Sequence, residues 1–191
     1  SALLILAFDD DSLFLHSDSL RAVQDTSDGR KIFYAYRHVK FFKSDLQGVC
    51  DSVVYSERDS LIWLFKNPVL WSDENQLTGD SIRIMMFQSQ IHSLWLDNNA
   101  FIVSKIIIDS SETDSAGYNQ IEGKKMKGHF IDNRLRKIDV KGNGKTIYYI
   151  QDKHDAFVGI NKTECADMII YMTDSVKTDE NTGSDKNEEQ K

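Results

Sequence analysis

The residue types of this chain that could carry chemistry are carboxylates, histidines, two cysteines and one glycine-rich turn. The turn KGNGKT ends like a phosphate-binding loop, with Gly144, Lys145 and Thr146. That loop needs a glycine five positions before its second glycine, and here the position holds Asp139. A helix must also follow, to direct its amide groups at phosphate, whereas TIYYI has the residue types of a strand. We therefore predict a hairpin turn and no nucleotide site.

Metal and redox chemistry are not indicated by the remaining ligand types. The histidines form no HExxH pair and have no partner at ligand spacing; they are His16, His38, His92, His129 and His154. Cys50 and Cys165 lie far apart in the sequence without a CxxC motif, so we interpret both as small apolar side chains rather than a disulfide. We predict no metal and no cofactor.

Similar segments recur around four aspartates. They read LFLHSDSLRA, LQGVCDSVVY, LTGDSIRIMM and KTECADMIIY, and contain Asp18, Asp51, Asp80 and Asp167, spaced by 33, 29 and 87 residues. Each aspartate precedes an apolar run, where a carboxylate can cap local amides. Catalytic carboxylates do not usually occur once per repeat, and there is no GxSxG motif, so we expect no enzyme activity. The acidic run Asp9–Asp11 has two interpretations, a calcium ligand set or a solvated turn.

The elements that must position these residues are strands. From residue 13 to 172 the pattern alternates with period two, in short runs separated by Asp, Asn, Ser and Gly, which predicts an all-β fold. The stretch from Gly79 to Lys105 is expected to form three strands and two turns, and the preceding repeat follows the same plan, with turns at KNP and DNN. Repeats of this length cannot bury their own apolar face, so they must stack into one domain. We predict this domain over residues 1–172, with a surface insertion at residues 109–119 and a disordered polar tail or linker at residues 173–191.

Composition narrows the possible partners. The 191 residues carry a formal net charge of -7, with 30 acidic and 23 basic side chains, which argues against a nucleic acid partner. The opening ALLILAF is too short to cross a bilayer, lacks a basic leader and is predicted to be the first strand.

The chain contains more aromatic and aliphatic residues than the turns, caps and strands assigned above require. In SLIWLF both faces of the predicted strand are apolar, with Ile62 and Leu64 on one face and Trp63 and Phe65 on the other. Such a strand is either buried on both sides or forms an interior wall with a surface that receives an apolar ligand. The two readings are equally supported by the pattern.

Taken together, these segments resemble a known family. A turn such as KNPVLW or RHVKFF, followed by LTGDSIRI or LQGVCDSVVY, resembles the repeat of the OstA/LptA family of lipopolysaccharide transport proteins, more specifically the OstA-like proteins of Bacteroidota-type bacteria. The resemblance covers about residues 13–172. It implies an open β-jellyroll, a folded-over sheet whose apolar interior carries the acyl chains of lipopolysaccharide through the periplasm.

The resemblance also implies partners and a site. The partners would be lipopolysaccharide or lipid A acyl chains, and other Lpt-type jellyroll domains or further copies of this chain joined end to end through terminal strands, with an outer-membrane association. ALLILAF would be a joining edge. Lys124 and Lys125 replace the Asp-Ser step of the pattern and could meet lipid phosphates. The interior positions would be Ile32, Tyr34, Val39, Phe41, Val53, Tyr55, Ile62, Leu64, Val69, Trp71, Ile82, Ile84, Met86, Leu94, Leu96, Phe101 and Val103.

Two other readings of the repeats stay open at this stage. One is a carbohydrate-binding or adhesive β-solenoid, although the irregular spacings argue against strict coils. The other is a structural protein-interaction module whose interior is filled by its own side chains.

Overall fold

In a computed structural model the chain is built from β-strands and the turns between them. The structure describes residues 1–7, 12–44, 46–72, 75–88, 90–108, 116–132, 134–152, 154 and 156–172, and no helix occurs among them. The predicted all-β class is therefore confirmed, while the acidic run Asp9–Asp11, most of the predicted insertion and the predicted tail lie outside the described residues. The strands are β1 (Ala2–Ala7), β2 (Ser12–Ser17), β3 (Ser19–Gln24), β4 (Lys31–Lys43), β5 (Leu46–Ser56), β6 (Leu61–Phe65), β7 (Val69–Ser72), β8 (Asn75–Thr78), β9 (Ser81–Phe87), β10 (Gln90–Ile107), β11 (Ala116–Ile131), β12 (Arg134–Gln151) and β13 (Phe157–Tyr171).

These strands form one sheet in which every pairing is antiparallel, with the order β1-β2-β4-β5-β6-β9-β10-β11-β12-β13 along its main path. The short strands β3, β7 and β8 lie beside this path. Three pairs of consecutive short strands, β2 with β3, β6 with β7 and β8 with β9, each take the place of one long strand in the sheet. A β-solenoid coil would stack its strands in parallel, so this topology excludes the solenoid reading.

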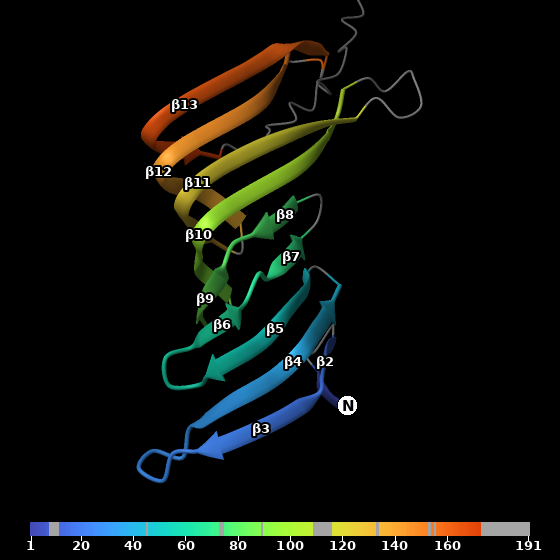
Figure 1. The fold of residues 1–191 in the computed structure, drawn as a ribbon, viewed down its shortest axis with the longest axis vertical. Coiled ribbons are helices and arrows are strands. Elements are labelled where there is room, and N and C mark those ends of the chain that lie inside the picture. The colour runs from blue at the N-terminus through green and yellow to red at the C-terminus, as the bar shows by residue number, and fades with distance from the viewer. Residues whose placement is uncertain are drawn as a thin grey trace, which may run out of the picture.

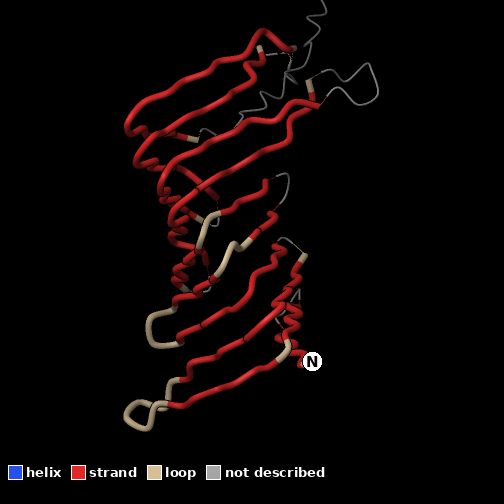
Figure 2. Tube along the Cα trace, viewed as in Figure 1, coloured by secondary structure: helices blue, strands red, loops and turns tan. Residues whose placement is uncertain are grey.

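The sheet folds over along a line that crosses every long strand. Pairing is interrupted between Tyr36 and Val39, and again between Asp97 and Ala100. The same interruption recurs in β11 and β12. Figure 1 shows the long strands β10–β13 turning back at this line, which we call the crease. It divides the sheet into two arms, and the tube in Figure 2 shows that strand structure continues almost unbroken on both sides.

Arm A contains β1, β2, β7 and β8, with residues 39–50 of β4 and β5, 100–123 of β10 and β11, and 144–165 of β12 and β13. Arm B contains β3, β6 and β9, with residues 31–36, 52–56, 90–97, 125–131, 134–141 and 167–171 of the long strands.

Two kinds of corner alternate along the crease. Every second strand turns through residues in the left-handed conformation, namely Arg37 and His38, Lys66 and Asn67, Asn98 and Asn99, and Gly142 and Asn143. Asparagine and glycine tolerate this conformation best. The strands between them turn at Asp18, Asp51, Asp80 and Asp167. The predicted turns RH, KNP, DNN and KGNG are therefore corners inside continuing strands rather than hairpin reversals. A left-handed pair is also the signature of a tight hairpin, which is why the sequence pattern does not separate the two.

The repeated aspartates bind these left-handed corners. Asp18 Oδ2 lies 3.0 Å from His38 Nδ1, and Asp51 Oδ2 lies 3.1 Å from Lys66 Nζ. Asp80 Oδ1 accepts a hydrogen bond from Asn99 Nδ2 at 2.9 Å, and Asp167 Oδ1 accepts one from the Gly142 amide at 2.9 Å. The predicted caps thus act on the neighbouring strand rather than on local amides.

The long interval between Asp80 and Asp167 contains one further corner. Lys124 occupies the crease in β11, 44 residues after Asp80 and 43 before Asp167. Each repeat therefore contributes two neighbouring strands to the folded sheet. The last two repeats contain more residues because β10–β13 are longer strands.

Candidate apolar binding face

The face of the sheet that points into the fold is lined by aliphatic side chains, and we call it the inner face. In arm B two rows cross the strands. Cross-strand partners define the first row as Leu20, Ala35, Val53, Leu64, Ile82, Leu96, Met126, Val140 and Met168. The second row, farther from the crease, is Phe33, Tyr55, Ile62, Ile84, Leu94, Gly128, Ile138 and Ile170.

Arm A faces these rows with one of its own. Its members are Leu15, Phe41, Gly48, Leu70, Leu77, Ile102 and Ile121. Buried residues of both arms join a single hydrophobic core. The core therefore lies between the arms and follows the crease.

Glycines in arm A allow the arms to approach. A Cβ added at Gly123 would lie 2.4 Å from Val140 Cγ1, and one at Gly144 would lie 2.9 Å from Met168 Cε. Val140 and Met168 belong to arm B. Small residues at these corners make room for larger side chains from the opposite arm.

The inner face is closed at the crease and more open away from it. Leu96 and Val140 in the first row are 0% exposed. Farther out, apolar side chains pack against the core but remain half-buried, among them Ile62, Ile91, Phe130, Leu135 and Ile170. An apolar ligand would meet these outer positions, because the crease is already filled by side chains of the chain itself.

The structure places most of the predicted interior residues on this face. These are Val39, Phe41, Val53, Tyr55, Ile62, Leu64, Ile82, Ile84, Met86, Leu94 and Leu96. The remaining ones lie on the opposite, outer face, since they alternate with buried neighbours; they are Ile32, Tyr34, Val69, Trp71, Phe101 and Val103.

The misplaced residues have one cause. Each follows or precedes a left-handed corner, and the predicted alternation shifts by one residue at that corner, whereas the inner positions continue across it without a shift. Trp71, for example, is 39% exposed, whereas its neighbour Leu70 is 1% exposed. Inner residues that the sequence reasoning missed include Phe33, Ala35, Leu70, Ala100 and Ile102. Ala35 and Ala100 gave a usable signal, because a small residue beside a corner fits the crowded crease and not an open face.

The outer face of arm B carries a ladder of charged and aromatic side chains. Arg83 Nη2 lies 2.9 Å from Asp97 Oδ2, and both Arg83 and Lys127 lie over the ring of Trp95. Farther along, Asp139 contacts Lys137 Nζ at 2.7 Å and His129 Nε2 at 2.6 Å. The hydrogen bond from Lys137, together with that from His129, holds the pKa of Asp139 below its usual range. These contacts tie neighbouring strands together and give the outer face a polar character that the inner face lacks.

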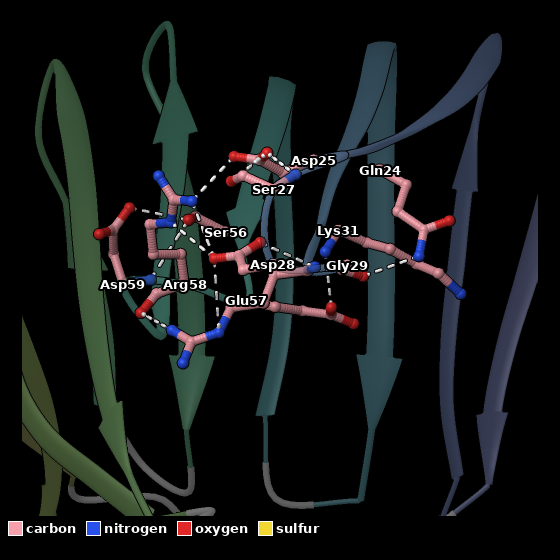
Figure 3. A network of polar contacts seen from close by, with 11 residues as sticks. Gln24, Asp25, Ser27, Asp28, Gly29, Lys31, Ser56, Glu57, Arg58 and Asp59 are labelled. Carbon is pink, nitrogen blue, oxygen red and sulfur yellow. Dashed lines mark hydrogen bonds and ion pairs between the residues drawn. The ribbon is translucent and has the colours of Figure 1, made fainter.

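A polar network also joins two turns at the free end of arm B (Figure 3). The Arg58 guanidinium contacts Asp25 Oδ2 and Asp28 Oδ2, each at 2.8 Å. The Lys31 amide donates to Glu57 Oε2 at 2.7 Å. Hydrogen bonds from Ser27 to Asp25 and from Arg58 to Asp28 lower the pKa of each carboxyl. All of its acidic groups have internal partners, so the network fixes the β3–β4 turn against the β5–β6 turn.

The ends of the sheet are edges. Among the described strands, β1 pairs only with β2, β3 only with β4, and β13 only with β12. Leu3 and Ile5 in β1 and Val158 and Ile160 in β13 are exposed. The prediction that ALLILAF forms the first strand, at an edge, agrees with this placement. Lys124 and Lys125 are exposed at the crease of β11.

The described ranges contain neither a cluster of metal-ligating side chains nor a membrane-spanning helix. No group of three or more His, Cys, Asp or Glu side chains there could hold a metal ion. Nor does that part of the chain contain a helix long and apolar enough to cross a bilayer.

No protein-family model matches the sequence. No curated protein matches it either. Among solved structures the chain is similar to the crystal structure of LptH from Pseudomonas aeruginosa, described as the LptA homologous periplasmic component of the conserved lipopolysaccharide transport device. The two share 13% sequence identity with a TM-score of 0.45, over 64% of this chain and 79% of that one.

Proposed function

We propose that this chain is a carrier or bridge segment that shields the acyl chains of lipopolysaccharide in the periplasm during transport to the outer membrane. The observation that carries the proposal is the inner face, where rows of aliphatic side chains run without interruption by charge from β3 to β13. The resemblance of the repeats to the OstA/LptA pattern supports the same conclusion.

Physical chemistry favours an acyl ligand at the half-buried positions. Burial of a methylene group stabilises a complex by about 0.8 kcal/mol, so partial burial of one chain suffices for useful affinity. Ile62, Phe130 and Leu135 offer apolar surface that the core does not fully cover. The bound chain would lie along the strand ends, between the arms.

The free edges suit the bridge part of the proposal. An unpaired edge presents backbone groups that another strand can bind. Within the part of the chain that the structure describes, no strand pairs with the outer side of β13 at one end of the sheet, or with the outer sides of β1 and β3 at the other. Further copies of this chain or other jellyroll domains would pair there, so that inner faces join into one apolar path.

Site-specific photocrosslinking tests the lipid site. A photoreactive side chain placed at position 62 or 130 should crosslink to labelled lipopolysaccharide, because both positions face inward and are half-buried. Matched positions 71 and 103, on the outer face of arm A, should not crosslink. Melting curves must show that every variant folds.

Two outcomes would contradict the proposal. Crosslinks confined to positions 71 and 103 would mean that lipid binds the other face. Crosslinks at none of the four positions would favour the protein-interaction module with a closed interior.

A further inference from the structure

The outer face of arm B carries a second surface that lipid shielding does not use. A hollow at the crease is lined by Asp18, Ser19, Tyr36, Arg37, His38, Asp51, Ser52 and Lys66. A smaller hollow lies between β6 and β9 and is lined by Trp63, Leu64, Phe65, Ser81, Ile82 and Arg83. Both open on the face opposite the core.

The linings of the two hollows adjoin along one row of side chains. Ser52 pairs with Tyr36 on one side and with Phe65 on the other. Phe65 in turn pairs with Ser81. The row Tyr36, Ser52, Phe65, Ser81 therefore runs across β4, β5, β6 and β9 and connects the hollows. We call it the outer trough.

Aromatic rings and small residues alternate along this trough. Tyr36 and Phe65 stand two strands apart, about 9.6 Å at ~4.8 Å per strand. Tyr34 and Trp63 repeat the same spacing in the adjacent row, where Val54 separates them. Tyr34 and Tyr36 stack at 5.9 Å, and Trp63 and Phe65 pack edge to face at 5.8 Å. The rings thus form two platforms, with Ser52 and Val54 between them.

The platforms are open to solvent. Trp63 is 40% exposed and Tyr36 is 38% exposed, on a face where a solvated antiparallel sheet ordinarily carries polar residues. Tyrosine and tryptophan combine an apolar ring with a polar group, and such rings are common where a ligand is partly apolar and partly hydroxylated.

Polar groups line the crease side of the trough. The Ser52 hydroxyl donates to Asp51 Oδ2 at 2.7 Å, and Asp51 also contacts Lys66. These hydrogen bonds hold the pKa of Asp51 below its usual range, so the group is an ionised acceptor at neutral pH. His38, Arg37 and Lys66 add donors within the same hollow. Carboxylates, hydroxyls and cations side by side offer partners to a ligand with many hydroxyl groups.

We propose that the outer trough binds a linear oligosaccharide lying across the strands, with sugar rings stacked on Tyr36 and Phe65 or on Tyr34 and Trp63. Platforms spaced two strands apart suit alternate units of an extended chain. An acyl chain is a poor fit, because polar and charged side chains, among them Ser52, Asp51 and Lys66, line the crease side of the trough. Nucleic acid is disfavoured by the net charge of -7 and by Asp18 and Asp51 in the wall.

Tryptophan fluorescence gives a direct readout. All three tryptophans, Trp63, Trp71 and Trp95, lie on the outer face, and only Trp63 lines the trough. A glycan array of linear disaccharides to octasaccharides, neutral and acidic, should identify glycans that bind. Titration with those glycans should then change the emission of the protein, and glycans long enough to reach both platforms should bind more tightly than shorter ones.

Matched variants assign the site. Trp63→Ala and Tyr36→Ala should each weaken binding about tenfold, because each removes one stacking platform. Trp71→Ala is the control, since Trp71 is exposed to the same degree but lies on arm A. Ser81→Tyr provides a variant that fills the smaller hollow without removing a ring, and it should also weaken binding. Circular dichroism checks that each variant folds.

The proposal would be overturned if no oligosaccharide on the array bound, or if Trp71→Ala weakened binding as much as Trp63→Ala. If the protein crosslinks to lipid at position 62 but binds no glycan, the proposed function stands and the oligosaccharide proposal is wrong.

Discussion

At the scale of single residues, the two cysteines show how position decides chemistry. Cys50 is 8% exposed on the inner face, and burial raises the pKa of its thiol to about 12. Cys165 is exposed in the edge strand β13, where its thiol donates to the carbonyl of Asp167 at 3.2 Å. Our sequence interpretation as free thiols agrees with both positions, but the apolar packing role fits Cys50 alone. The nucleophilic species is the thiolate, so the two should differ strongly in reactivity.

We expect a thiol reagent such as DTNB at pH 8 to modify one cysteine in the folded protein and two in urea. Cys165→Ser should abolish the reaction of the folded protein, and Cys50→Ser should leave it unchanged. The measurement is absorbance of the released thiolate over time. Rapid modification of Cys50 in the native state would mean that the core at the crease opens readily.

At the scale of elements, the space between the two arms limits which side chains the strands can carry at the crease. Gly123 is buried and leaves room for Val140, whereas an added Cβ at Gly159 in β13 would meet no atom within 4 Å. Both glycines lie in strands of arm A, so they differ mainly in the space around them.

Gly123→Ala should therefore destabilise the protein by about 1–3 kcal/mol, the usual cost of overpacking a core. Gly159→Ala should be neutral or slightly stabilising, because it reduces the freedom of the unfolded chain without a clash. Urea denaturation of both variants measures the difference. Equal midpoints would show that Val140 moves aside and that the arms are not closely packed at β11.

At the scale of the whole molecule, ion pairs bind the folded sheet at many points. Lys141 and the Gly142 amide lower the pKa of Asp167, and the pKa values of Asp25, Asp28, Asp51 and Asp139 are lowered as well. A carboxyl whose pKa is lower in the folded state adds stability above its unfolded pKa. That stability is lost as the pH falls through the folded value, because the unfolded state binds more protons.

The melting temperature should accordingly be nearly constant between about pH 7 and pH 5 and should fall steeply below about pH 4. The double variant Asp51→Asn, Asp167→Asn should melt lower at neutral pH and show a shallower acid decline. Asp132→Asn, in the hairpin turn between β11 and β12, is the control. Calorimetry across this range is the measurement, and a double variant that keeps the full acid decline would show that the crease pairs contribute little.

The all-β class, the repeats and most of one apolar face could be predicted from alternation alone. Val53, Leu64, Ile82 and Leu96 fall on the correct face because each lies within an uninterrupted run. The left-handed pairs keep this alternation, since Leu96, Ala100 and Ile102 are all buried, so the expectation that such a turn shifts the phase of the side chains is wrong there. Trp71 and Val103 were misassigned for this reason.

The outer trough could not be predicted in the same way. Tyr36 and Phe65 lie 29 positions apart in the sequence and become neighbours across Ser52 only through pairing of β4, β5 and β6. The sequence also does not show whether a bulky side chain such as Trp63 is buried or exposed. Pair register, rather than composition, decides which of them meet.

The alternation of corners along the crease has a consequence for how such a chain changes length. Each unit combines one left-handed corner with one aspartate corner, or with Lys124 in β11, and among the described strands it pairs only with its neighbours along the sheet. In-frame duplication of a gene segment that encodes one unit would add two strands, about 9.6 Å of sheet, without altering any contact already present. The sheet can therefore gain or lose whole units in the direction across its strands. The longer strands β10–β13 instead extend the sheet in the direction along its strands.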